Sequence, residues 1–243
     1  MERDYAELSR KLVEWIREKA AKAGCRGTVF GLSGGVDSST VALLCKRSFP
    51  NDCLGLIMPC HSASLDMEHA SLLAAKADIP HKVVPLDDVY DRLLEVAGDV
   101  GLPERRGLAR ANLKPRLRMA TLYYHANALS YIVAGTGNKS EATVGYFTKY
   151  GDGGVDILPI GNLVKGEVYG LAEHLGVPRE IIEKPPTAGL WADQTDEAEM
   201  GLTYRELDRY ILTGEAPEEV ERKIEAMHRA SEHKRRLPLV PDF

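Results

Sequence analysis

The 243-residue sequence lacks a surplus of basic charge, because 31 lysines and arginines are outnumbered by 36 aspartates and glutamates. Its net charge of −5 disfavours a protein that wraps nucleic acid, whose phosphates require a basic surface. A small anionic ligand can still bind such a chain through a few well-placed donors. We therefore expect no nucleic-acid partner.

The sequence also lacks the long apolar run, about eighteen residues, that a membrane-spanning helix requires. Its N-terminus has an amphipathic helical pattern, without the apolar core of a signal peptide. Hydrophobic residues make up 44% of the chain and charged residues 28%, which are ordinary values for a globular protein. We expect a cytoplasmic protein with no membrane partner.

Cysteine is scarce, and the four cysteines, Cys25, Cys45, Cys53 and Cys60, form no C-x-x-C pair. Three of them lie in apolar surroundings, which is typical of small buried side chains in a reducing cytosol. The seven histidines show no H-E-x-x-H spacing. We therefore expect neither a disulfide framework nor a zinc site.

Short apolar runs alternate with helical patterns in the first half of the chain, which predicts parallel strands with helical crossovers. The fold class expected is α/β, with a doubly wound parallel sheet flanked by helices. Ligands bind beyond the carboxyl ends of the strands in such sheets. The expected strands are residues 28–32, 53–58, 81–84 and 131–135.

The long helical pattern at 108–130 tolerates Pro115 only near its start or at a kink. Beyond residue 136 the pattern changes, and a glycine-rich segment at 145–154 predicts a mobile loop. We expect one domain over residues 1–243, ending in a helical tail. The later elements expected are a helix at 165–175, an irregular stretch at 183–201, and helices at 203–213 and 217–234.

The strongest local signal is the string GLSGGVDSS at residues 31–39, between a buried strand and a helix. Its glycines allow a tight turn close to a ligand, and the helix that follows presents free N–H groups to an anion. The serines add hydroxyl donors, so the string suits a phosphate. It is neither a kinase-type P-loop, because the Gly-Lys-Ser/Thr ending is missing, nor G-x-G-x-x-G.

Asp37 is unusual in this string, because a carboxylate repels a phosphate. A Mg2+ ion between the two removes the repulsion, so Asp37 favours a metal–nucleotide substrate. The plainer alternative is a strand-to-helix turn in which Asp37 stabilises the helix N-terminus. Two glycines alone would favour that alternative, but the whole string after a buried strand does not.

The string resembles the Ser-Gly-Gly-x-Asp-Ser signature of pyrophosphatase-loop ATP enzymes, which include tRNA-thiolating enzymes and NAD+ synthetases. Four further segments resemble NAD+ synthetases specifically: 135–141, 145–156, 159–165 and 185–191. The resemblance spans nearly the whole chain in order. It implies an adenine nucleotide alpha-hydrolase-like fold and a homodimer.

The resemblance also implies the roles of individual residues, with ATP, deamido-NAD+ and ammonia as substrates and Mg2+ as cofactor. No residue serves as nucleophile or general base. The implied ATP contacts are Gly31, Leu32, Ser33, Gly34, Gly35, Val36, Asp37, Ser38, Thr136, Lys165 and Thr187. The implied deamido-NAD+ contacts are Arg116, Lys149, Asp156, His233 and Lys234, and the implied metal ligands are Asp37 and Glu141.

Several of these residues have a plainer interpretation when taken singly. Glu141 by itself is typical of an acid in the first turn of a helix, and Arg116 of a solvated basic face. Lys149 has a stronger case, because a cation in a glycine-rich loop can close over an anionic ligand. His233 and Lys234 lie in a charged tail and would otherwise be interpreted as solvent-exposed.

The reaction implied is a ligation that needs no protein nucleophile. The nicotinate carboxylate attacks the α-phosphate of ATP, pyrophosphate leaves, and ammonia then displaces AMP. Two other functions stay open: a tRNA-modifying enzyme of the same loop family, and a non-catalytic adenine-nucleotide-binding module. The first would need a basic groove and catalytic cysteines. The second would have no reason to gather Asp37, Glu141 and Lys165 around a phosphate.

The nitrogen donor expected is free ammonia rather than glutamine. Releasing ammonia from glutamine calls for a nucleophile, usually cysteine, in a domain of its own. The synthetase-like pattern runs from about residue 5 to 234, and the four cysteines all fall between residues 25 and 60. That placement indicates core packing rather than an amidase site.

Overall fold

A computed structural model describes the whole chain except residues 1–2, 99–100, 102, 188, 190–194 and 243. The described residues contain one four-stranded parallel sheet, in which the strand order is β3-β2-β1-β4. The four expected strands are all present, with slightly different ends, which confirms the doubly wound α/β class. They are β1 (Gly27–Gly31), β2 (Cys53–Ile57), β3 (His81–Val83) and β4 (Tyr131–Val133).

The first strand lies inside the sheet, with β2 on one side and β4 on the other. Thr28 pairs with Cys53 in β2 and with Ile132 in β4. The direction of winding therefore reverses between β1 and β4. In open parallel sheets the ligand crevice forms at this reversal, beyond the carboxyl ends of the two strands.

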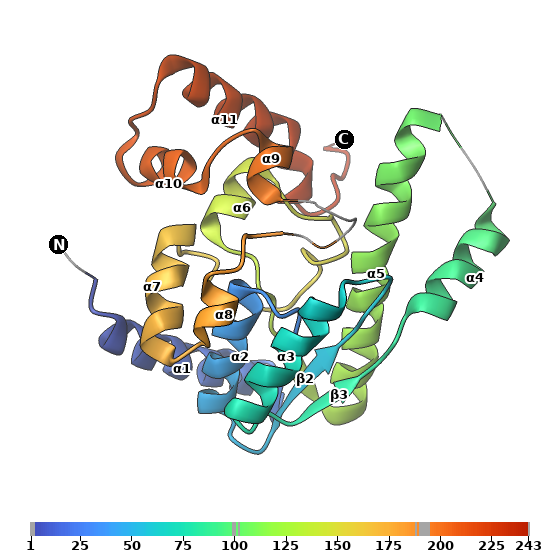
Figure 1. Ribbon diagram of the computed structural model, residues 1–243, viewed down its shortest axis with the longest axis vertical. Helices are drawn as coiled ribbons and strands as arrows, with labels where there is room; N and C mark the ends of the chain where they lie inside the picture. The colour runs from blue at the N-terminus through green and yellow to red at the C-terminus, as the bar shows by residue number, and fades with distance from the viewer. Residues whose placement is uncertain (1–2, 99–100, 102, 188, 190–194, 243) are drawn as a thin grey trace.

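Helices cover both faces of the sheet (Figure 1). Neighbouring residues of a strand point to opposite faces, and β1 shows this directly: Phe30 packs in one apolar core and Val29 in the other. Both side chains are fully buried, as expected for a sheet covered on both sides. The Phe30 core lies against α1 (Tyr5–Lys22), α2 (Val36–Ser48), α3 (Ser64–Lys76) and α7 (Lys165–Leu175). The Val29 core lies against α4 (Asp87–Ala97) and α5 (Pro103–Leu129).

Of the two positions expected for Pro115, the one near the helix start is excluded, because α5 begins at Pro103 and Pro115 lies well inside it. Pro115 lines the cavity described below as the candidate active site. A Cβ placed on Gly151 would stand 3.0 Å from the Pro115 Cβ, so the glycine-rich loop packs closely on this turn of the helix. The helix therefore loses one backbone hydrogen bond at the point where it contacts the loop.

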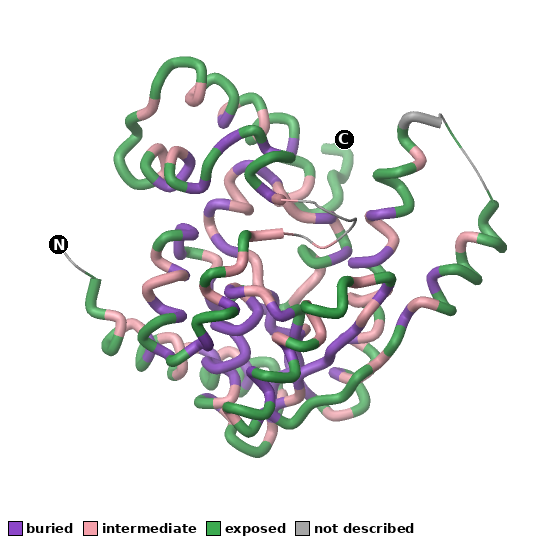
Figure 2. The backbone as a smooth tube through the Cα atoms, viewed as in Figure 1, coloured by how far each residue is buried: buried purple, intermediate pink, exposed green. Residues whose placement is uncertain are grey.

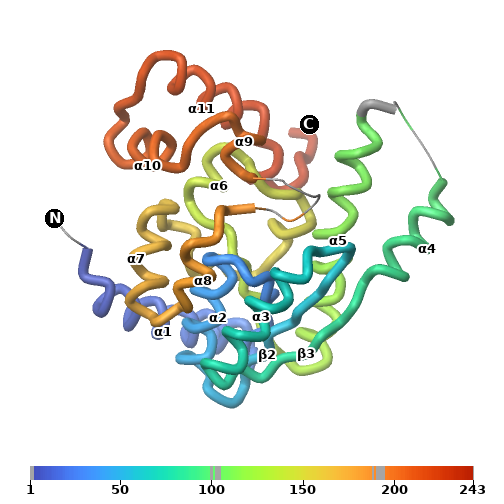
Figure 3. Tube along the Cα trace, in the orientation of Figure 1, coloured from blue at the N-terminus to red at the C-terminus, as the bar shows by residue number. Residues whose placement is uncertain are grey.

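The C-terminal part folds back over the carboxyl ends of the strands (Figure 3). It has a small apolar core of its own, which includes Val144, Leu207 and Ile224. The helices here are α6 (Lys139–Val144), α9 (Asp196–Met200), α10 (Tyr204–Thr213) and α11 (Glu218–Ala230), followed by a 3-10 turn at Glu232–Lys234. Outside that core, most residues of α10 and α11 are exposed (Figure 2). The short helix α8 (Arg179–Ile182) packs instead in the Phe30 core through Ile181.

The expected irregular stretch at 183–201 is wrong at its end, because α9 forms there. The Thr195 side chain accepts a hydrogen bond from the Ala198 backbone N–H at 3.4 Å and so caps this helix. Ser/Thr followed by acidic residues is an N-terminal helix signal, and it was overlooked. Trp191, in the segment compared with NAD+ synthetases, lies outside the described residues.

The cysteines and the apolarity of the helices can both be compared with the expectations from composition. All four cysteines are free thiols, and three of them are buried. Burial raises the pKa of Cys45 to about 12, so this thiol stays protonated and behaves as an apolar side chain. Within the described residues, no helix is long and apolar enough to cross a membrane.

Candidate active site

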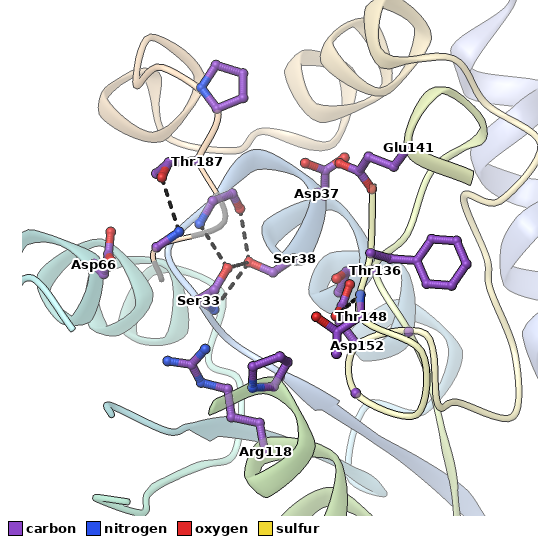
Figure 4. Close-up of a pocket in the computed structure, with 18 of the residues that line it drawn as sticks. Ser33, Asp37, Ser38, Asp66, Arg118, Thr136, Glu141, Thr148, Asp152 and Thr187 are labelled. Carbon is purple, nitrogen blue, oxygen red and sulfur yellow. Dashed lines mark hydrogen bonds between the residues drawn. The ribbon is translucent and has the colours of Figure 1, made fainter. Parts of the chain in front are cut away.

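A cavity of about 410 Å³ opens at the carboxyl ends of β1 and β4, where the winding reverses. It is lined by residues that the sequence assigned to ATP and metal: Gly31, Leu32, Ser33, Gly35, Val36, Asp37, Ser38, Thr136, Glu141, Lys165 and Thr187. Residues 31–38 reach it from the turn between β1 and α2, and Thr187 faces that turn from across the cavity (Figure 4). The structure thus brings the predicted ATP contacts together.

The turn after β1, which we call the phosphate turn (residues 31–38), is shaped for an anion. Gly34 has a φ of +75°, and a Cβ there would stand 2.3 Å from the Asp66 carbonyl oxygen, so only glycine fits. Gly35 is the N-cap of α2 and has no side-chain cap, which leaves N–H groups of the first turn available to a ligand. The Ser33 and Ser38 hydroxyls lie 2.9 Å apart and hold the turn together.

Three ionisable side chains meet in the cavity: Asp37 at the start of α2, Glu141 in α6 and Lys165 at the start of α7. The Lys165 Nζ donates to the Asp37 Oδ2 at 2.6 Å and to the Glu141 Oε1 at 3.4 Å. The Lys165 side chain is only 2% exposed, and its Nζ lies 4.8 Å from the centre of the Tyr204 ring. We call Asp37, Glu141 and Lys165 the ionic triad.

The triad perturbs the protonation of its own members. Burial, and then the nearby charge of Asp37, raise the pKa of Glu141 to about 8. Burial opposes the charged form of Lys165, but the Asp37 and Glu141 carboxylates outweigh it and its pKa is raised. Perturbed carboxyl and ammonium groups facing a cavity mark a candidate functional site.

Asn138 is a site residue that the sequence interpretation missed. Its Nδ2 donates to the Asp37 Oδ1 at 2.9 Å, and its Oδ1 accepts from the Glu141 backbone N–H at 3.0 Å. The Glu141 carboxylate in turn accepts from the Asn138 backbone N–H at 3.1 Å, which completes a capping box. One fully buried amide therefore positions both carboxylates. The Asn-x-x-Glu spacing was the available signal.

We expect Asn138→Ala to lower turnover by roughly tenfold or more, because Asp37 and Glu141 lose the group that orients them. The lost cap should also reduce the free energy of unfolding by about 1 kcal/mol. Thr203→Ala is the matched control, since Thr203 forms an equivalent capping box at α10, outside the cavity lining. Equal turnover losses in the two variants would reduce Asn138 to a helix cap.

A divalent metal fits the two carboxylates of the triad. Both already approach one point, the Lys165 Nζ, so they can share a cation. Mg2+ is commonly held by one or two carboxylates together with substrate phosphates and water. The described residues contain no group of three or more His, Cys, Asp or Glu side chains suited to a metal ion, so the substrate would supply the remaining ligands.

Four of the residues assigned to deamido-NAD+ form a second group at the rim, and hydrogen bonds connect three of these four. The Arg116 Nη2 donates to the Lys149 carbonyl oxygen at 3.3 Å, and the Lys149 Nζ donates to the His233 carbonyl oxygen at 2.6 Å. Lys234 follows and donates to the Gly145 carbonyl oxygen at 2.8 Å. The glycine-rich loop is thus joined to both α5 and the C-terminal tail.

Asp156 lies apart from these four residues. Its carboxylate accepts from the Val133 backbone N–H and from the Tyr123 hydroxyl, each at 2.9 Å, so it is held at the end of β4. It lines a separate shallow hollow together with Trp15 and Lys19. The structure therefore does not bring all the residues assigned to deamido-NAD+ into one pocket of the chain.

The sequence interpretation missed further polar residues of the cavity wall. Asp196 is 5% exposed and accepts from the Tyr204 hydroxyl at 2.9 Å, beside the triad. Lys184 forms an ion pair with Asp66, next to the phosphate turn. Arg118 reaches the cavity from α5. None of them stands at a motif position in the sequence, and their proximity depends on how distant segments meet.

Comparisons with known proteins agree with this geometry. The family described as NAD synthase matches residues 8–238. The NH(3)-dependent NAD(+) synthetase of Carboxydothermus hydrogenoformans is 52% identical over 238 residues, which cover 98% of each chain. The structure of NMN synthetase from Francisella tularensis matches with a TM-score of 0.94 and 37% identity, over 100% of both chains.

A second solved structure, the NH3-dependent NAD synthetase from Campylobacter jejuni, matches with a TM-score of 0.81 and 28% identity, over 99% of this chain and 100% of that one. The sequence and structural matches both span almost the full length, and the adenine nucleotide alpha-hydrolase-like fold is confirmed with them. The resemblance inferred from the motifs is thus correct: the chain belongs to the NAD synthase family.

Proposed function

We propose that this enzyme is an ammonia-dependent NAD+ synthetase, which adenylates the nicotinate carboxylate of deamido-NAD+ with ATP and then amidates it. The observation that carries the proposal is the convergence of the phosphate turn and the ionic triad in one cavity. A plain adenine-nucleotide-binding module gains nothing from two carboxylates beside a phosphate. Family membership and the ammonia-dependent relatives add support.

In the first step, a carboxylate oxygen of the nicotinate attacks the α-phosphorus of ATP, and the bond to the β-phosphate oxygen breaks to release pyrophosphate. The N–H groups at the start of α2 and the Ser33 and Ser38 hydroxyls hold the phosphates in line. Lys165 offsets the charge that builds on the departing pyrophosphate. No side chain is needed as a nucleophile, because the substrate provides it.

In the second step, ammonia adds to the acyl carbonyl, AMP leaves with the bonding electron pair, and the nitrogen loses a proton. The cavity wall holds the acyl-adenylate and ammonia together. It also limits the access of water, which would otherwise hydrolyse the adenylate. When bound by Asp37 and Glu141, Mg2+ neutralises phosphate charge.

The remaining predicted contacts bind the substrates. Thr136 and Thr187 add hydroxyl donors to the ATP site. Donors to the dinucleotide come from the rim residues Arg116, Lys149, His233 and Lys234.

A second acid substrate is favoured by one comparison. The Francisella tularensis neighbour is an NMN synthetase, and amidation that yields NMN starts from nicotinate mononucleotide. The same chemistry at this cavity would then act on a substrate without the adenylate half. The position of Asp156, apart from the other four predicted contacts, is compatible with either acid at the rim.

The experiment is pyrophosphate release from ATP and Mg2+, measured with ammonium chloride and either deamido-NAD+, nicotinate mononucleotide or no acid. Release that requires deamido-NAD+, with formation of NAD+, is expected. Faster release with the mononucleotide would favour the second candidate, and ATP binding without release would favour the binding module. Glutamine as sole nitrogen source, freed of ammonia, should give no product.

We also expect a homodimer. Tyr124 in α5 is 72% exposed and lies within residues 117–133, a stretch more apolar than one face of the sheet requires, and apolar surface beyond the needs of one core tends to mark an interface. Light scattering at micromolar concentration should give twice the chain mass of 26.7 kDa. Tyr124→Glu should shift the protein toward monomer. Leu212→Glu, at an exposed position of α10, is the control and should not. A monomeric parent protein would end this proposal.

A further inference from the structure

Arg118 is a cation of the cavity wall to which the proposed mechanism gives no role. It extends from α5 toward the carboxyl end of β2. Its Nε donates to the Met58 carbonyl oxygen at 3.0 Å, and its Nη2 donates to the Ser62 Oγ at 3.1 Å. Both acceptors are neutral, so the guanidinium is fixed in place without a counter-charge from these two bonds.

No carboxylate of the described residues lies within ion-pair distance of Arg118, although the side chain is partly buried. Asp66 acts on it from a distance, but the Asp66 carboxylate already pairs with Lys184. Burial lowers the pKa of the Arg118 guanidinium, yet arginine stays protonated in proteins. The cavity wall therefore holds a positive charge that no carboxylate of the described residues pairs with directly, because Asp66, Asp152 and Asp87 act on it only from a distance.

The contrast with Lys165 is informative. Lys165, which is almost fully buried in the cavity wall, meets two carboxylates of the triad. A buried charge is unfavourable unless a partner compensates for it. Arg118 lacks such a direct partner among the described residues, so an anion that enters the cavity can supply it.

The N–H donors of Arg118 that have no protein partner also indicate an anionic ligand. Nη1 has no hydrogen-bond partner among the described residues, and the guanidinium has five N–H donors in a planar fork that suits phosphate and carboxylate. Figure 4 shows Arg118 directed toward Ser33 in the phosphate turn, on the opposite side of the turn from Asp37 and Glu141. Arg118 and the triad thus approach the turn from two sides.

We propose that Arg118 binds an anionic oxygen of a substrate in this cavity, and thereby adds a second positive charge to the site opposite the ionic triad. The oxygen belongs either to a phosphate of ATP or to the carboxylate of the nicotinate substrate. The guanidinium points toward Ser33 in Figure 4, and this direction favours the phosphate. The choice between these two sources rests on the proposed function, whereas the binding of an oxyanion does not.

The test compares Arg118→Gln, Arg118→Lys and Ser62→Ala with the parent protein, by calorimetric binding of ATP with Mg2+ and by steady-state kinetics. Losing a charge-assisted hydrogen bond should weaken ATP binding by roughly 10- to 100-fold in Arg118→Gln. Arg118→Lys keeps the positive charge but loses the planar guanidinium donors. Its affinity for ATP should therefore lie between that of the parent protein and that of Arg118→Gln. Arg92→Gln, on the exposed surface of α4, is the control for simple loss of charge.

Ser62→Ala separates binding from structure, because it removes one anchor of the guanidinium and keeps its charge. It should bind ATP much as the parent protein does. An increase in KM for the acid substrate alone in Arg118→Gln would also support the proposal and would identify the carboxylate as the oxyanion. Unchanged binding of ATP and of both acids would overturn it, and so would an equal loss in Ser62→Ala.

The binding measurement needs no turnover, so it distinguishes this proposal from the proposed function. A parent protein that binds ATP but forms no amide would end the proposed function, and the Arg118 variants would remain testable by calorimetry. Melting temperatures of all variants accompany the binding data. A loss of ATP binding that merely follows a loss of folded protein would count against Arg118.

Discussion

Asp37→Asn should lower turnover by roughly 100-fold or more while the protein stays folded. Its carboxylate accepts from Lys165 and Asn138 and faces the position of the phosphates. The fold should persist because Glu141 remains beside Lys165. The Asp37 charge raises the pKa of Glu141, so Glu141 ionises more readily in the variant and replaces the lost negative charge.

The measurement is turnover as a function of Mg2+ concentration, with circular dichroism as the check on folding. Asp37→Asn should need more Mg2+ than the parent protein for half-maximal rate. Asp88→Asn, an exposed acid in the first turn of α4, is the control and should leave the rate unchanged. Normal turnover of Asp37→Asn at limiting Mg2+ would exclude a metal role for this residue.

Lys165→Met should have the second large effect, a loss of turnover of roughly 1,000-fold, because a fixed positive charge next to the departing pyrophosphate is removed. The variant also leaves Asp37 and Glu141 facing each other. Removing one partner of a buried ion pair typically destabilises a protein by about 3–5 kcal/mol. Glu141, whose pKa is already about 8, should become protonated in the variant, which removes the repulsion between the two carboxylates. The loss of stability should therefore lie near the lower of these two values.

Mg2+ provides a readout that activity cannot. In Lys165→Met the two carboxylates are no longer occupied by an ammonium group, so millimolar Mg2+ should raise the melting temperature more than it does in the parent protein. Lys76→Met, an exposed lysine in the last turn of α3, controls for the loss of surface charge. Equal Mg2+ shifts in all three proteins would show that the carboxylates do not form a cation site.

The sheet could be predicted from the sequence because its strands are short apolar runs bounded by turn residues, and Val29 and Phe30 are both buried in it. Parallel crossovers then determined where residues 31–38 would lie. The turn itself follows from local chemistry, because Gly34 has a φ that other residues rarely adopt. Local features and strand order together were sufficient for this half of the site.

The other half depends on contacts between residues far apart in the chain. Lys165 was assigned to ATP, but its bond to Asp37 joins residues 128 positions apart and is visible only once α2 and α7 are packed together. Arg118 looks like an ordinary basic residue until its missing counter-charge is seen. Pairing of buried charges is a property of packing, and single-residue patterns do not contain it.

The contact between Gly145 and Ser231 has a consequence for how the molecule opens. A Cβ on Gly145 would stand 2.0 Å from the Ser231 Cβ, and the Arg235 Nη1 donates to the Ala142 carbonyl oxygen at 3.0 Å nearby. These contacts close a long segment of chain around a small apolar core separate from the two cores of the sheet. Small cores with exposed surfaces open at lower free energy than the global fold, and they do so cooperatively. The rim of the cavity and α10–α11 should therefore exchange their amide hydrogens as one unit, while the amides of β1 stay protected.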